Sequence, residues 1–460
     1  MKRTSTIVLL AGVALGNVAF AQSNADRAYT AELMADAEGR TSLLRQSGAA
    51  ESGVPALRSA DGNFSLKIGG LVQARYVADF RRKDNAAGAT QVVGPNDNFT
   101  HGFEMNETRI SFTGNVVNPD LTYAIGWGFN SSGSASLDDA YINYAFSNGV
   151  SLRAGQFKLP ILTEELVGWG QQQAVDRSTT NNFFSQGWSQ GLQLGYRSEQ
   201  FQGRVAFSDG VRTQNTPFNS AAESDYALTG RADLKLSGDW KQFDQFSSWQ
   251  GAQTASLIGA AFHWQNNGGT GDGVDGTPAA KPANTAKPGV GLFLWTVDAQ
   301  IKGGGWNIFG ALIGSIVDPN ATSTGTGTAA VNRSTNNLGV VLQGGFFATS
   351  QLEFFARWDA IFADKKNGTG GNELTSRNFH FLTLGGNYYV APESQAAKLT
   401  TDLVFSFSKT SNLRGNLFSG SQGGTSAPGF GAVLPDAESS VRGSGKSPEI
   451  ALRVQFQLMF

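Results

Sequence analysis

The chain has 460 residues but no cysteine, only 3 histidines and 13 prolines, and charged residues make up 16% of it. The lack of cysteine excludes disulfides, thiolate nucleophiles and cysteine-ligated metals. Stability must therefore come from another source, such as a closed ladder of hydrogen-bonded strands. The formal net charge of -2 gives no whole-molecule signal for nucleic acid or an anionic membrane surface, and we expect no nucleic-acid partner.

Long apolar runs are also lacking, except at the N-terminus. Lys2 and Arg3 precede an apolar stretch over 7–15, and Ala19 and Ala21 complete the pattern of a secretory signal peptide. A membrane anchor is the alternative, but glycine interrupts the stretch, which is shorter than the roughly 20 apolar residues of a spanning helix. We therefore predict a signal peptide for the Sec route over residues 1–21. An exported chain with no later apolar run is either soluble or a β-barrel.

What the chain does contain is glycine, with 58 residues, phenylalanine, with 32, and a regular alternation of apolar and polar residues. Leu66 and Ile68 flank Lys67 in this way, and Phe456 and Leu458 flank Gln457. Period-two alternation predicts strands with one apolar face. Sixteen segments show it: 66–79, 109–114, 121–129, 140–146, 150–158, 191–197, 201–207, 226–236, 256–265, 292–302, 306–316, 338–347, 352–362, 379–390, 398–408 and 450–460.

The links between these segments alternate in length. The short, turn-rich links are 118–120, 147–149, 198–200, 303–305 and 348–350. The long links, rich in Gly, Ser, Thr and Asn, are 82–100, 266–290, 317–336, 363–378 and 409–448. Short periplasmic turns that alternate with long external loops are typical of outer-membrane barrels. The link 237–253 is long where a short turn is expected, so it is either an elaborated turn or wrongly bounded.

The sequence thus predicts an all-β fold, a transmembrane antiparallel β-barrel of about 16 strands over residues 63–460. Residues 22–62 form a periplasmic lead-in, either a short helix or disordered. A soluble β-sandwich also alternates, but it has no need of long loops on one side only. Sixteen strands leave a water-filled lumen, so we expect a pore for small hydrophilic solutes in the cell outer membrane, in contact with lipid.

Several cations fall on the polar faces of these strands. We predict that these cations line the pore, namely Arg75, Arg109, Arg153, Arg204, Arg231, Arg357 and Arg453, together with Lys158 at the end of its strand. A wet column of guanidinium groups attracts anions. Carboxylates share these faces, at Glu107, Asp139, Asp233, Glu353 and Asp359. Ion pairs between adjacent strands, which stiffen the wall, are the alternative reading, and together these charges predict a weak preference for anions.

The connection 159–190 is too aromatic for a solvated tip. Its aromatic residues are Trp169, Phe183, Phe184 and Trp188, and its charged residues are Glu164, Glu165, Asp176 and Arg177. Such anchors predict a constriction loop that folds into the lumen. The alternative is an outward loop that packs on its own aromatic residues or on a neighbouring subunit.

Four motifs flank and occupy this connection: Arg-Ala-Gly-Gln-Phe-Lys-Leu-Pro at 153–160, Glu-Glu-Leu at 164–166, Asp-Arg-Ser at 176–178 and Gly-Leu-Gln-Leu at 191–194. In this order and spacing the chain resembles the phosphate-selective porin O and P family, and the likeness extends more loosely from residue 63 to the end. The resemblance implies a homotrimeric porin whose third external loop enters the channel. It also implies anion conduction, in some members with a preference for phosphate or polyphosphate.

The chain departs from that family at the constriction. Phosphate-selective members have lysines there, whereas 159–190 contains no lysine, one arginine and three carboxylates. Only Lys158, at the strand end, could take a lysine position. Phosphate selectivity is therefore not assumed.

No catalytic grouping emerges from the sequence. His101, His263 and His380 lie in separate segments without a partner at metal spacing, so we expect no enzyme, no metal site and no cofactor. The other function that we consider is a structural or adhesive surface protein, with the barrel as the anchor and the external loops as the working part. The terminal aromatic Phe460 resembles the signal by which assembly machinery recognises outer-membrane barrels.

Overall fold

The structure is a computed structural model, and it describes residues 56–82, 99–130, 133–217, 224, 226–266, 290–319, 334–365, 377–408 and 446–460. The predicted signal peptide, most of the lead-in and most of the long external links lie outside the described residues. Within them, no helix is long and apolar enough to cross a membrane.

The described residues are mostly strand. The strands are β1 (Ala56–Arg58), β2 (Ser65–Arg82), β3 (Phe99–Asn115), β4 (Leu121–Phe129), β5 (Ala135–Ala145), β6 (Val150–Lys158), β7 (Trp188–Arg197), β8 (Phe201–Ser208), β9 (Tyr226–Ser237), β10 (Ala255–Asn266), β11 (Val290–Gly303), β12 (Trp306–Pro319), β13 (Thr335–Phe347), β14 (Leu352–Phe362), β15 (Asn378–Tyr389), β16 (Ala397–Ser406) and β17 (Lys446–Met459). Four short helices of the described residues lie in connections between strands: α2 (Thr163–Leu166), η1 (Trp169–Gln171), α3 (Thr179–Phe184) and η2 (Trp240–Asp244).

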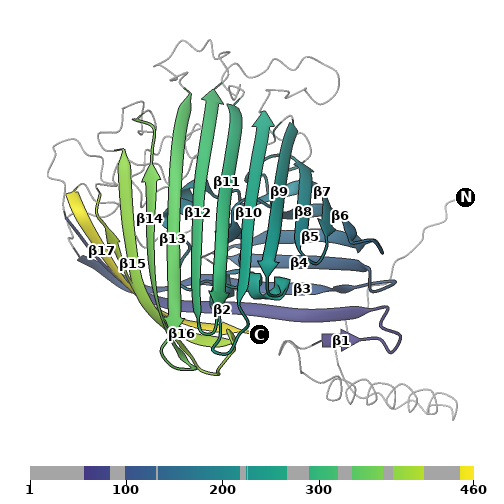
Figure 1. The fold of residues 1–460 in the computed structure, drawn as a ribbon, viewed down its shortest axis with the longest axis horizontal. Coiled ribbons are helices and arrows are strands. Elements are labelled where there is room, and N and C mark those ends of the chain that lie inside the picture. Colours follow the sequence, from purple (N-terminus) through teal and green to yellow (C-terminus); the bar gives the residue numbers. More distant parts are fainter. Residues whose placement is uncertain are drawn as a thin grey trace, which may run out of the picture. The chain divides into compact units, whose positions relative to one another are not determined.

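The strands from β2 to β17 form a closed antiparallel ring (Figure 1). Each strand pairs with the next along the chain, and β17 closes the ring by pairing with β2, with Arg453 opposite Val77. The short strand β1 pairs with the first residues of β2, before the stretch that β17 covers. Closure satisfies the backbone of every strand on both edges, which a lipid environment demands. The predicted antiparallel barrel of 16 strands is confirmed.

The two faces of the ring differ as the alternation predicts. On β14 the side chains of Glu353, Arg357 and Asp359 point inward and are buried, whereas Phe354 and Trp358 point outward and are exposed. Exposed leucine, valine and phenylalanine side chains cover the outside of the other strands in the same way. An apolar outer band against a polar interior is the arrangement of an outer-membrane barrel.

One strand boundary differs clearly from the sequence pattern. Strand β3 begins at Phe99, ten residues before the predicted 109. The register between β2 and β3 shifts between Gln73 and Ala74, which pair with Glu107 and Met105. On β3, the odd-numbered Phe103 and Met105 therefore point outward. Beyond the shift, even-numbered residues such as Phe112 point outward. This irregularity breaks the period-two pattern, because it moves the apolar residues from odd to even positions.

The long link between β9 and β10 is an elaborated turn. Residues 238–254 separate Ser237 from Ala255, and they contain η2. This helix begins with a capping box between Asp239 and Gln242. We call residues 238–254 the inner turn, because its Phe243 and Phe246 side chains are buried within the ring. The predicted strand boundaries on either side hold to within a residue or two.

Candidate functional site

The connection between β6 and β7, residues 159–187, lies within the ring of strands, and we call it the inner loop. It contains α2, η1 and α3. Phe183 and Phe184 are fully buried, in one cluster with the inward-facing Leu294 and Phe381 of the wall. Because these contacts are with inward faces, the loop occupies the lumen.

Two glycines of β13 let the inner loop approach the wall closely. A Cβ atom at Gly339 would lie 2.6 Å from Thr180 Cγ2 and 2.6 Å from Phe184 Cε2. A Cβ atom at Gly345 would meet the amide end of the Gln173 side chain, which is flexible, so the tighter restriction is at Gly339. Real Cβ atoms do not approach neighbours as closely as one would at Gly339, so glycine is needed there for the loop to lie against this strand.

The carboxylate of Asp176 joins the inner loop to the strands that close the ring. Arg75 Nη2 of β2 lies 2.8 Å from Asp176 Oδ1, and Arg453 Nη1 of β17 lies 2.6 Å from Asp176 Oδ2. Arg453 also pairs with Asp402 of β16 through its Nε at 2.7 Å, and the Val175 backbone N–H donates to Asp402 at 3.0 Å. Each buried charge has a partner, as burial in a low dielectric requires.

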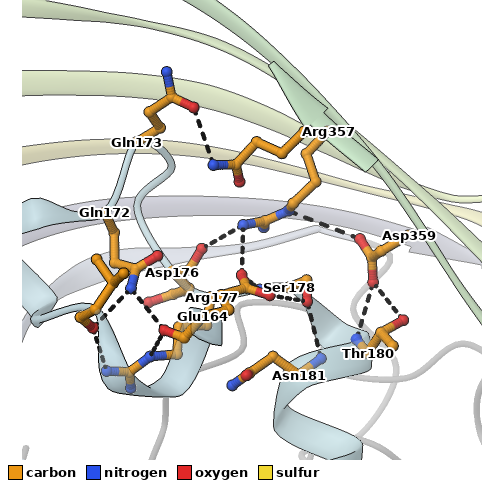
Figure 2. A network of polar contacts seen from close by, with 12 residues as sticks. Glu164, Gln172, Gln173, Asp176, Arg177, Ser178, Thr180, Asn181, Arg357 and Asp359 are labelled. Carbon is orange, nitrogen blue, oxygen red and sulfur yellow. Dashed lines mark hydrogen bonds and ion pairs between the residues drawn. The ribbon is translucent and has the colours of Figure 1, made fainter. Parts of the chain in front are cut away.

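Glu164 and Asp176 also meet Arg357 of β14 (Figure 2). Arg357 Nη1 lies 3.4 Å from Glu164 Oε1 and donates to the Asp176 carbonyl at 2.9 Å. Glu164 accepts hydrogen bonds from the Ser178 N–H at 2.5 Å and the Ser178 hydroxyl at 2.6 Å, and Ser178 in turn caps α3. The Thr180 N–H donates to Asp359 at 2.9 Å, so α3 is held to β14 as well.

Glu165 has cations on both sides. Lys158 Nζ lies 3.0 Å from its carboxylate, Arg177 Nη1 lies 3.6 Å away, and the Asn181 amide donates to it at 2.9 Å. Burial by itself raises the pKa of Glu165, but Arg177 and Lys158 together outweigh it and hold that pKa well below its usual range. The guanidinium of Arg177 also lies 3.5 Å from the centre of the Trp169 ring.

On the opposite part of the wall, Arg231 of β9 holds the start of the inner loop. It donates to the Ile161 carbonyl at 2.8 Å and to the Thr163 hydroxyl at 2.7 Å, and it pairs with Asp298 of β11 at 2.9 Å. The loop is therefore fixed to β9 and β11 at one end and to β17 and β2 further along.

The eight predicted pore-lining cations fall into two groups. Four are buried and hold the inner loop or its wall partners, namely Arg75, Arg231, Arg357 and Arg453. The other four are half-buried, namely Arg109, Arg153, Lys158 and Arg204. Alternation in the sequence predicts that the seven arginines point inward, but it does not predict this for Lys158, and it does not indicate to which group each cation belongs.

In the half-buried group the cation is more accessible than its partner. The Arg109 side chain is 21% exposed and its partner Glu107 is 7% exposed. For Arg204 and Asp233 the values are 20% and 4%, and for Lys158 and Glu165 they are 15% and 5%. The positive member of each pair therefore faces the accessible space.

These cations lie on one side of the ring, on β3, β6 and β8. Their inward-facing neighbours Ser111, Asn143 and Ser151 are also half-buried, while the inward-facing residues of β14 are buried beneath the inner loop and the inner turn. Arg153 lies over the Tyr141 ring at 4.1 Å. We call the half-buried inward face of β3 to β8 the accessible strip.

Several residues of the site were missed in the sequence. Asp298 and Asp402 pair with wall arginines, and Lys302 and Lys398 donate to backbone carbonyls of the lumenal segments. Their positions on polar strand faces could have identified them as inward-facing, but not as anchors. Among the described residues no group of three or more His, Cys, Asp or Glu side chains is placed to hold a metal ion.

Comparisons with known proteins agree with this architecture. The family model described as phosphate-selective porin O and P matches residues 72–402. No curated protein sequence matches the chain.

The chain is also similar to solved structures, three of which are given as examples. An anion-selective porin from Comamonas acidovorans aligns with a TM-score of 0.51 at 11% identity, over 86% of this chain and 100% of that one. The outer membrane channel DcaP of Acinetobacter baumannii aligns with a TM-score of 0.51 at 13% identity, over 87% and 99%. OmpT of Vibrio cholerae in its trimer form aligns with a TM-score of 0.50 at 10% identity, over 86% and 99%. At these identities the likeness extends to the fold alone.

Proposed function

Because the chain belongs to the phosphate-selective porin O and P family, a family of non-enzymatic outer-membrane channels, we propose that it lets small hydrophilic solutes diffuse passively with a weak preference for anions. The permeation path runs along the accessible strip. Arg109, Arg153, Lys158 and Arg204 are its pore-lining cations.

The observation that carries this proposal is the unequal exposure within the ion pairs of the strip. Arg109 is 21% exposed against 7% for Glu107 and 11% for Asp138, and Arg204 is 20% exposed against 4% for Asp233. A passing ion therefore meets the cation at closer range than its partner, and the local potential favours anions even though the formal net charge is -2. Because the partners remain close, the preference is weak.

The three carboxylates of the inner loop do not cancel this preference. Glu164, Glu165 and Asp176 are all buried, and each pairs with a cation of the wall or of the loop itself. Their role is to dock the loop as a constriction element. With no lysine in 159–187, the loop offers no cluster of cations that would bind phosphate preferentially.

A homotrimer is part of the proposal. The family resemblance implies it, and OmpT of Vibrio cholerae, similar in fold, has a trimer form. The mass of the purified protein in detergent, measured by light scattering with the detergent contribution subtracted, tests it directly.

Recordings from planar bilayers across a potassium chloride gradient test the pore and its charge preference. We expect a stable open conductance and a reversal potential on the anion-selective side. Replacing Arg109, Arg153 or Arg204 singly with glutamine should lower the ratio of anion to cation permeability by about twofold. Phosphate or a neutral sugar, added to the bath, should reduce the current no more than it does in a porin without solute selectivity.

The control is Arg58→Gln, which removes the same charge from β1, outside the ring. It should leave the reversal potential unchanged. A reversal potential on the cation-selective side would overturn the anion preference, and a barrel that never conducts would favour the anchor with working external loops.

A further inference from the structure

The inner turn reaches much further across the barrel than a connection between neighbouring strands requires. It leaves β9 and returns to β10, yet the Trp240 indole N–H donates to the Ser198 carbonyl beyond β7 at 3.1 Å. At its other end the Ser247 hydroxyl lies 2.9 Å from the Tyr389 hydroxyl of β15. Gln245 accepts from Gln395, in the turn after β15, at 3.2 Å. The segment therefore spans the end of the ring where the short turns lie.

The inner turn also contacts the inner loop. The Phe246 N–H donates to the Gln171 carbonyl at 3.3 Å. The Phe246 side chain packs with Val167 of the inner loop and with Phe309 and Val341 of the wall, and it is 1% exposed. The two segments enter from opposite ends of the barrel and meet inside it.

One wall residue, Glu353 of β14, is bonded to both segments. It is fully buried. Its Oε1 accepts from the Gln173 amide of the inner loop at 2.7 Å, and its Oε2 accepts from the Ser247 hydroxyl of the inner turn at 2.9 Å. Asn387 and Tyr389 of β15 donate to Oε2 as well, at 3.0 Å and 2.6 Å.

Two wall lysines each bind one of the two segments through backbone carbonyls. Lys302 donates to the Gln242 carbonyl of the inner turn at 2.9 Å and to that of Gln245. Lys398 donates to the Gln172 carbonyl of the inner loop at 2.6 Å. Both segments are therefore bound to the wall opposite the accessible strip. Because the donors are charged, these hydrogen bonds are stronger than bonds between neutral groups.

We propose that the inner turn is a second constriction element of this pore, and that Glu353 is the positioning residue that joins it to the inner loop. Together the two segments fill the side of the lumen formed by β9 to β17 and confine solutes to the accessible strip. The inference rests on the proposed function, because it concerns the cross-section of the same pore.

Replacing residues 239–254 with Asn-Gly tests the inner turn. Ser237 pairs with Ser256, so Gly238, the Asn-Gly pair and Ala255 make a four-residue hairpin loop, a length that antiparallel strands accept. Single-channel conductance should rise by about twofold, and larger neutral sugars should enter in liposome swelling, because the segment that crosses this mouth of the barrel is removed. The anion preference should stay unchanged, because the cations of the strip remain.

Glu353→Gln tests the positioning role without removing the turn. Glutamine has one acceptor oxygen where glutamate has two, so the Gln173 amide and the Ser247 hydroxyl can no longer both donate to residue 353 as they do to the carboxylate. Conductance should rise less than in the deletion, and Glu353→Gln should add nothing when combined with it. Glu449→Gln is the control, since Glu449 is a buried carboxylate at the far end of β17. It should conduct like the unaltered protein.

The outcomes separate this inference from the proposed function. If the unaltered protein does not conduct, the proposed function fails. If it conducts, and the deletion variant, shown to be folded by heat-modifiable mobility, has the same conductance and sugar cutoff, the inference alone fails. A conductance rise in Glu353→Gln that persists in the deletion background would overturn the positioning role.

Discussion

At the scale of single residues, partners decide what an inward-facing charge does. Arg453 is buried between Asp176 and Asp402 and serves to hold the inner loop. Arg204, paired only through one end to Asp233, keeps a fifth of its side chain exposed. Breaking the first kind of pair strands a buried charge, which costs about 3–5 kcal/mol, whereas an exposed charge contributes less than about 1 kcal/mol to stability.

The pH dependence of the inner loop follows from Glu165. Its pKa in the folded protein lies below the unfolded value of about 4.3, so its ion pairs stabilise the loop fully above that pH. That stabilisation is lost only as the pH falls below about 4.3 toward the folded pKa. The difference in tryptophan fluorescence between the unaltered protein and Glu165→Gln isolates this group from the other carboxylates, so it should stay constant from pH 7 to about 4.5 and shrink below that pH.

Glu165→Gln provides the comparison for this titration. Its loop should already be loosened at pH 7, and its fluorescence should change less on acidification. A difference between the two proteins that already shrinks between pH 7 and about 5 would contradict the lowered pKa of Glu165.

At the scale of elements, the inner loop depends on strand β13 for room. Thr180 and Phe184 of α3 lie against Gly339, where a side chain does not fit. On β12, by contrast, a Cβ atom at Gly310 would make only ordinary contacts at 3.9 Å. The same residue type therefore has a packing role at one position and not at the other.

Gly339→Ala should destabilise the docked loop by about 1–3 kcal/mol, the usual cost of overpacking a filled interior. The inner loop should become more sensitive to proteolysis, and open-channel current should become noisier. Gly310→Ala is the matched variant on the neighbouring strand and should behave like the unaltered protein. Equal effects of the two substitutions would show that the close approach at Gly339 is not limiting.

At the scale of the whole molecule, closure between β17 and β2 holds the barrel together. The ladder continues to the last residue, where the Gly70 N–H donates to the Phe460 carbonyl at 2.8 Å and the Phe460 N–H donates to the Gly70 carbonyl at 3.0 Å. An open edge within a bilayer would leave backbone groups unsatisfied at a cost of several kcal/mol each. The fold is therefore complete only as a ring.

Val454→Pro should prevent formation of the folded barrel, because proline within a strand that is paired on both sides removes a ladder bond and costs about 3 kcal/mol or more. Heat-modifiable electrophoretic mobility and circular dichroism measure this loss. Leu57→Pro is the control, because β1 lies outside the ring and should tolerate proline. Folded Val454→Pro protein would contradict the requirement for closure.

The sequence by itself determined the sixteen strands of the ring and their faces, because period-two alternation is a local property that each strand expresses independently of the others. It missed the first ten residues of β3, since the register shift at Gln73 depends on the partner strand. The aromatic and charged residues of 159–190 predict a constriction loop, but not that Asp176 pairs with Arg75 and Arg453, which come from strands at opposite ends of the sequence.

Only the tertiary structure decided which inward cations are anchors and which line the accessible strip. Arg75 and Arg204 are both arginines on the inward face of a strand, each between uncharged residues in the sequence. Arg75 is nevertheless buried, whereas Arg204 is half-buried. The difference depends on where the inner loop and the inner turn lie within the ring. That placement depends on long-range packing, on Gly339 and on Glu353, and no local pattern encodes which wall a lumenal segment covers.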